Sequence, residues 1–190
     1  MQRRQKMKRI EFVVLFVGFL ITLTACTATI ADNERGVYFD RNGNAHLLEP
    51  GQHFLGWEPV DVHIVSTEVQ TYTMTTASGG DLTGNDSVEA RSVDGLRLFV
   101  DAEVVFQIIP DKAVELVKSF GGDQSQYVSE LVRPTARTII YNTAVKYKSV
   151  DIVGNQRDKA EADMNQQLAE QLQQFGIRLI KLKLLKVMNG

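Results

Sequence analysis

The sequence predicts an α+β fold, because strand-like segments fill its first half, helix-like segments follow, and one more strand-like segment closes the chain. The clearest strand lies at residues 96–108, where apolar and polar side chains alternate. Helical patterns lie between residues 110 and 175, and the closing strand covers residues 177–187. This order favours a sheet that begins early in the chain and is completed by its last strand.

A β-hairpin is expected near the start of the folded part. Residues 36–40 and 45–48 are its predicted strands, since Asn42-Gly43 between them is a preferred pair for a tight turn. Residues 60–75 are rich in Val, Ile, Thr and Tyr, which favour strands, so a longer strand is expected there.

The strand at residues 96–108 is predicted to have one dry and one wet face. Its apolar face, by a period of two, consists of Leu96, Leu98, Val100, Ala102, Val104, Phe106 and Ile108. Its other face carries Arg97, Asp101, Glu103 and Gln107. Such a strand belongs to a sheet that is covered on one side only.

Three helices are expected after this strand. The first begins at Pro110 and ends at Gly121-Gly122. The second covers residues 123–146, and Pro134 inside it predicts a kink or a break. The third covers residues 154–175 and is stopped by Gly176.

The closing strand carries four cations, namely Arg178, Lys181, Lys183 and Lys186. A period of two places Lys181 and Lys183 on one face and the other two cations on the opposite face. Two interpretations stay open: a patch that contacts anionic lipid head groups, or lysines that protect an edge strand from pairing.

Composition limits the number of domains and the kinds of partner. Residues 32–190 form one folded part of about 160 residues, which is the size of one ordinary domain. The first eleven residues hold five basic residues and one acid, so the remainder holds 16 basic and 22 acidic residues. This net negative charge argues against general nucleic-acid binding, which depends on cations that neutralise phosphates. The single cysteine excludes an intramolecular disulfide.

The first 31 residues are predicted to direct the protein to a membrane. A basic cluster precedes an apolar run that starts at Phe12, and residues 12–30 are long enough to span a bilayer as a signal-anchor helix. Alternatively, Leu23-Thr24-Ala25-Cys26 resembles a bacterial lipoprotein signal, which would be cut before a lipid-modified Cys26. Both interpretations place residues 32–190 on the extracytoplasmic, periplasmic side of the membrane.

Four segments in one order resemble the band 7 superfamily of stomatins, prohibitins and flotillins. They are ERGVYFDRNG, EPGQHF, SVDGLRLFVDAEVVFQI and FGIRLIKLKLLKV, at residues 34–43, 49–54, 92–108 and 175–187. The first two segments are most similar to the prohibitin branch. The resemblance implies an SPFH domain, with an antiparallel-rich sheet and helices packed on one side. It also implies self-association at the membrane, with a membrane protease as one partner.

The same resemblance carries one departure. Most members continue past the last strand into a long charged helix that assembles them, whereas this sequence stops at Gly190. Assembly by such a helix is therefore not expected.

No catalytic, cofactor or metal site is predicted. His46, His53 and His63 lack close ligand spacing and are interpreted as turn or surface residues. The loop at residues 77–87 is rich in Gly, Asp, Ser and Asn and is expected to be solvated, although nearby acids raise the alternative of a calcium loop. Those acids are Asp81, Asp86 and Glu89. The sequence contains neither a Gly-x-Ser-x-Gly elbow nor a phosphate-binding loop.

The expected function is that of a non-enzymatic, membrane-tethered scaffold or regulator of membrane proteins, which acts as a homo-oligomer. The alternative is a monomeric envelope lipoprotein that binds a ligand or a receptor. Trp57, Lys181 and Lys183 are candidate contacts with the membrane interface, and Trp57 is equally well interpreted as a core residue.

Overall fold

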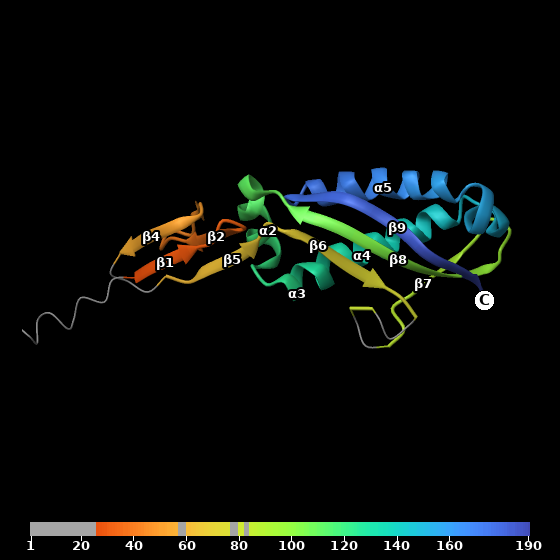
Figure 1. The fold of residues 1–190 in the computed structure, drawn as a ribbon, viewed down its shortest axis with the longest axis horizontal. Coiled ribbons are helices and arrows are strands. Elements are labelled where there is room, and N and C mark those ends of the chain that lie inside the picture. Colours follow the sequence, from red (N-terminus) through yellow and green to blue (C-terminus); the bar gives the residue numbers. More distant parts are fainter. Residues whose placement is uncertain (1–25, 57–59, 77–79, 82–83) are drawn as a thin grey trace, which may run out of the picture.

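The computed structural model describes residues 26–56, 60–76, 80–81 and 84–190. Figure 1 shows an elongated molecule with a group of short strands at one end and a larger α/β part beside it. We call residues 26–66 the N-terminal lobe and residues 69–190 the body. The antiparallel sheets and the helices confirm the α+β class.

The N-terminal lobe contains two small antiparallel sheets. Strand β1 (Cys26–Ile30) pairs with β4 (Gly51–Gly56), while β2 (Glu34–Phe39) lies between β3 (Ala45–Leu48) and β5 (Val62–Ser66). The β2–β3 hairpin confirms the predicted turn: the Asp40 amide donates to the Asn44 carbonyl, and Gly43 has a φ of 82°.

The strand expected at residues 60–75 proves to be two strands. Strand β5 belongs to the lobe, whereas β6 (Val69–Met74) pairs with β8 (Arg97–Ile108) in the body. The chain leaves one sheet and enters the other at Thr67, whose amide donates to the carbonyl of Asn33. Strand-favouring composition alone does not show such a change of sheet.

Strand β8 is the centre of the body sheet. Strands β6 and β7 (Val88–Arg91) pair with different parts of one edge of β8, and β9 (Ile177–Asn189) pairs along its other edge. The predicted apolar face is confirmed from Leu98 onward by side chains with no exposed surface: Leu98, Val100, Ala102, Val104, Phe106 and Ile108. Its predicted first member, Leu96, lies before the strand and is 48% exposed. The expected wet face has one exception, since Asp101 is buried and accepts a hydrogen bond from the Thr75 hydroxyl at 3.1 Å.

The helices lie between β8 and β9 in the chain. They are η1 (Pro110–Lys112), α2 (Ala113–Phe120), α3 (Gln124–Tyr127), the π-helical η2 (Val128–Val132), α4 (Arg133–Ala144), the π-helical η3 (Asp151–Asn155) and α5 (Arg157–Gln173). Helix α5 packs along β9, and α4 packs against α5 and β7 (Figure 1). Gly176, with a φ of 78°, ends the last helix as expected.

Pro134 does not break the second helical segment. It lies in the first turn of α4, where a missing N–H costs least, and the π-helical turn η2 directly precedes it. The wider turn offsets the hydrogen bond that proline cannot donate, so the chain stays helical through this point.

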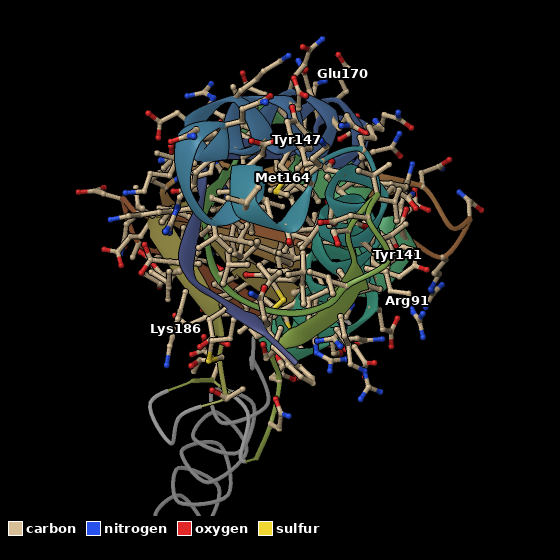
Figure 2. All side chains as sticks on the ribbon, turned by 90° about the vertical axis from the view of Figure 1, so that its right-hand side faces the viewer. Arg91, Tyr141, Tyr147, Met164, Glu170 and Lys186 are labelled. Carbon is tan, nitrogen blue, oxygen red and sulfur yellow. The ribbon has the colours of Figure 1, made fainter. Side chains whose placement is uncertain are left out.

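One hydrophobic cluster fills the space between the sheet and the helices. Its largest side chains without exposed surface include Phe106, Met164, Leu168 and Leu172. Figure 2 shows Met164 near the middle of the body in the view along its long axis. The body is therefore a two-layer structure that leaves the other sheet face free of helices.

The predicted membrane segment falls mostly outside the described residues. Residues 26–30, which the spanning-helix interpretation included, form strand β1 instead, because their backbone pairs with β4. Among the described residues, no helix has the length and apolar composition needed to cross a bilayer.

Candidate functional site

The four cations of β9 lie on one face of the sheet. They pair across the strands with alternate residues of β8: Arg178 with Gln107, Lys181 with Val105, Lys183 with Glu103 and Lys186 with Asp101. All four β8 residues belong to the face opposite the helices. We call these four cations the cationic strip.

Two β-bulges explain why the predicted division of these cations over two faces is wrong. The register shifts between Lys181 and Leu179, and again between Lys186 and Leu184, so one residue is inserted at each place. The inserted residues, Ile180 and Leu185, are 48% and 42% exposed. Each extra residue shifts the alternation of the side chains beyond it by one position. Arg178 and Lys186 therefore lie on the same face of the sheet as Lys181 and Lys183.

The free edge of β9 is covered by polar side chains of α5. The Asn165 amide group binds both backbone groups of Leu182, donating to its carbonyl at 2.8 Å and accepting from its N–H at 2.7 Å. Glu161 accepts a hydrogen bond from the N–H of Leu184, and Arg157 donates one to the carbonyl of Leu184. Three side chains spaced by four residues along a helix therefore replace a neighbouring strand.

A groove of about 720 Å³ lies between α4 and α5 on the solvent side of the helices. Its charged residues are Glu130 and Glu170, and no cation lines it. Pro134 and Ile139 give it apolar surface, and several amides and hydroxyls give it polar surface. We call it the acidic groove.

The loop expected to be solvated contains the most buried charge cluster of the described residues. Asp86 is 2% exposed and accepts from the Arg133 guanidinium at 2.6 and 3.0 Å and from Arg137 at 3.2 Å. The Tyr72 hydroxyl donates to its other oxygen at 2.5 Å. The expectation holds for Asp81, Gly84 and Asn85, which are exposed, and fails at Asp86, because its partners Arg133 and Arg137 on α4 follow some fifty residues later in the chain.

The geometry of this cluster indicates a structural role. Burial, and then the Asp86 carboxylate, raise the pKa of Tyr72, while the same carboxylate raises the pKa of Arg133. Both side chains therefore keep their protons at every ordinary pH. Groups held so firmly in one protonation state attach the loop to α4 and are unsuited to acid–base catalysis.

The acids of the calcium-loop alternative are not brought together. Asp81 accepts from the Thr73 amide at 2.5 Å, Asp86 binds the arginines of α4, and Glu89 accepts from Arg97 at 2.6 Å. Within the described ranges, no three His, Cys, Asp or Glu side chains gather in a metal-binding arrangement.

The three histidines lie apart, in separate local contacts of the lobe. His46 stacks on Tyr38 and contacts Asp40 at 3.2 Å, and His53 contacts the carbonyl of Glu49 at 2.7 Å. His63 meets the edge of Phe39. Their placement agrees with turn and surface roles.

A second pocket, of about 430 Å³, lies at the end of the body away from the lobe. Lys146, Lys148 and Lys159 line it together with Tyr147 and Asp163, and we call it the end pocket. The Tyr147 hydroxyl donates to Asp163 at 2.5 Å, which raises the pKa of Tyr147 to about 12. The nearby Val93 is 59% exposed, so this pocket combines cations with apolar surface. No sequence motif indicated it, because its residues come from three separate segments.

The remaining predicted site residues are placed only in part. Cys26 is the first residue of β1, is half-buried and pairs with Gly56 across the lobe sheet. Trp57 lies outside the described residues. Lys181 and Lys183 are exposed within the cationic strip, and their contact with lipid stays a prediction.

Comparison with known proteins gives one result that covers almost the whole described chain. The family model of the SPFH domain / Band 7 family matches residues 28–189, from inside β1 to the end of β9. No curated protein matches the sequence. The matched range includes both sheets of the lobe and the complete body, and we conclude that the chain belongs to the SPFH domain / Band 7 family.

Proposed function

We propose that this protein is a non-enzymatic, membrane-tethered SPFH protein that self-associates at the membrane and scaffolds or regulates membrane proteins. We place it in the prohibitin-like branch, in a bacterial or bacteriophage-derived envelope. A membrane protease is one candidate partner. Residues 32–190 would lie on the extracytoplasmic side.

The observation that carries the proposal is the position of the family domain directly behind a membrane-type sequence. Strand β1 begins at Cys26, at the end of the apolar run, and the family match begins at Ala28. A lipidated Cys26 would itself be the first residue of the lobe, so a lipid anchor would hold the lobe directly against the membrane. Because residues 26–30 form β1, a spanning helix would have to end before Cys26 and would likewise meet the lobe directly. The body's exposed cationic and acidic surfaces suit protein contacts.

The proposal is tested by membrane fractionation of the full-length protein, followed by size measurement in mild detergent. We expect the protein in the membrane fraction, and we expect particles of several subunits. A strictly monomeric protein at every concentration would contradict the self-association.

The form of the anchor is tested separately by mass spectrometry of the mature protein. An intact Met1 would show a signal-anchor, whereas a chain that begins at an acylated Cys26 would show a lipoprotein. In the lipoprotein case, we expect Cys26→Ser to abolish processing.

A second candidate function is that of a monomeric envelope lipoprotein that binds a ligand or a receptor. The end pocket favours it, because cations and apolar surface meet there in a concave site. A monomer that loses binding to a membrane neighbour on Lys146→Glu and Lys148→Glu would support this candidate over the scaffold.

A further inference from the structure

We propose that the cationic strip of one copy packs onto the acidic groove of the next copy. This inference rests on the self-association proposed above and names the two surfaces that would make the contact. The partner is therefore a second copy of this chain.

The fold itself does not explain the cationic strip. None of its four members forms an ion pair with another residue of the described ranges. Protection of the strand edge is already provided around Leu182 and Leu184 by Asn165, Glu161 and Arg157 of α5. Lys183 and Lys186 lie opposite Glu103 and Asp101 of β8, whereas Arg178 and Lys181 lie opposite uncharged residues. The four cations therefore leave an excess of positive charge on this face.

The acidic groove has the complementary chemistry. Glu130 and Glu170 supply two carboxylates without a lining cation, and neither forms an ion pair within the described part of the chain. Pro134 also lines the groove, together with Ile139, which is only 6% exposed. On the strip, the exposed bulge residues Ile180 and Leu185 lie between cations along β9. The two surfaces therefore match by the opposite sign of their charges, and the bulge residues add exposed apolar surface on the side of the strip.

The two surfaces lie on opposite sides of the two-layer body. The strip is on the sheet face without helices, and the groove is on the solvent side of the helices. In the view along the long axis, Lys186 and Glu170 lie on different sides of the body (Figure 2). A contact between two different faces leaves each copy with one free strip and one free groove, so it repeats until a ring closes or a filament grows.

This arrangement is compatible with a common membrane. Copies that associate side by side along their long axes keep all lobes at the same end of the assembly, because the lobe lies at one end of each elongated molecule (Figure 1). A lipid surface is the competing partner for the cations. However, a lipid surface would leave the acidic groove, on the opposite side, without a role.

The experiment uses the full-length protein in mild detergent at low salt and measures assembly size by sedimentation velocity. The strip variant carries Lys181→Glu and Lys183→Glu, and the matched control carries Lys112→Glu and Lys118→Glu, which make the same change of charge at exposed positions of η1 and α2, outside the strip, the acidic groove and the end pocket. We expect the strip variant to assemble at least about tenfold more weakly, since like charges would face each other. The control should assemble like the wild type.

The groove provides the rescue. Glu130→Lys and Glu170→Lys should weaken assembly alone and should restore it when combined with the strip variant, because the signs of both surfaces are then exchanged. Circular dichroism checks that every variant folds.

Each other outcome contradicts the inference in a distinguishable way. If the wild type assembles and the strip variant assembles equally well, or the groove variant fails to rescue it, the surfaces are wrong while self-association stands. If the strip variant loses binding to phosphatidylglycerol vesicles but keeps its size, the strip serves lipid. A wild type that is monomeric throughout overturns this inference and the scaffold function together.

Discussion

The N-terminal lobe and the body differ in the length of their strands and in the size of their hydrophobic core. The lobe strands are four to six residues long, and its buried apolar side chains are Ile30, Val37, Leu48 and Val65. In the body, β8 and β9 are 12 and 13 residues long, α5 packs along β9, and α4 packs against α5 and β7. The lobe therefore contributes little hydrophobic core of its own compared with the body.

Polar contacts differ in the same way. In the lobe, Asp40 binds Asn42 and Asn44 within one hairpin, and the hydrogen bonds from Asn44 lower the pKa of Asp40. In the body, Asp86 binds Arg133 and Arg137, which lie 47 and 51 residues further along the chain. Local contacts shape a turn, whereas distant contacts hold the tertiary structure together.

The largest expected effect compares two leucines of the two regions. Leu168→Ala in α5 removes a side chain with no exposed surface and should cost about 2–5 kcal/mol of unfolding free energy. Leu48→Ala in the lobe, where the side chain is 7% exposed, should cost less, because a thin sheet can collapse around the gap. Urea denaturation measures both values. Equal losses would contradict the contrast between the regions.

Hydrogen exchange tests whether the lobe unfolds separately from the body. Leu48→Ala should weaken amide protection in β2 and β3 and leave β8 and β9 protected, since the lobe opens locally. Uniform loss of protection along the chain would show that lobe and body unfold as one unit.

The next effect concerns the buried Asp86 cluster. Asp86→Ala leaves two guanidinium groups without their carboxylate and should lower the unfolding free energy by about 3 kcal/mol. Tyr72→Phe, which keeps both ion pairs and removes one hydroxyl, is the matched control and should cost about 1 kcal/mol. A smaller loss for Asp86→Ala than for its control would show that the cluster does not hold the loop.

A smaller effect is expected at the covered edge of β9. Asn165→Leu removes both partners of the Leu182 backbone and should cost about 1–3 kcal/mol. Gln166→Leu is the control, because the side-chain hydrogen bond of Gln166 goes to Glu170 on the exposed surface of the same helix and not to the strand. Thermal unfolding compares them. Equal stability of the two variants would mean that the edge does not need its cover.

The smallest effect depends on pH. Hydrogen bonds from Ser92, and then from Ser149, lower the pKa of Asp94 below its usual value of 3.8. A lowered pKa means that the stabilisation is present above this value and is lost as the pH falls through the folded-state pKa. The wild type should therefore exceed Asp94→Asn in stability at pH 6, and the two should converge in strong acid. If the stability difference between the two proteins grew as the pH fell, the predicted direction of the pH dependence would be wrong.

Sequence patterns predicted the features that depend on near neighbours. The hairpin at Asn42-Gly43, the alternation of β8 and the stop at Gly176 follow from local backbone preferences and periodicity. The α+β class follows from the order of the elements.

The features that decide the candidate surfaces depend on pairing between distant segments. A period-two count along β9 could not reveal the extra residues Ile180 and Leu185, because a bulge is defined only against its partner strand. Asp86 looked solvated for the same reason, since its arginines lie on α4. The acidic groove likewise needs two helices that meet only in the folded protein.

Carbodiimide cross-linking of the full-length protein, reconstituted in mild detergent, tests the contact between the cationic strip and the acidic groove. The reagent joins a lysine amine to a carboxylate in direct contact, and mixing ¹⁴N- and ¹⁵N-labelled copies before assembly identifies links between chains by mass spectrometry. The account predicts mixed-isotope links from Lys181 or Lys183 to Glu130 or Glu170. Assemblies of several subunits that carry no such link, or links only within one chain, would contradict it.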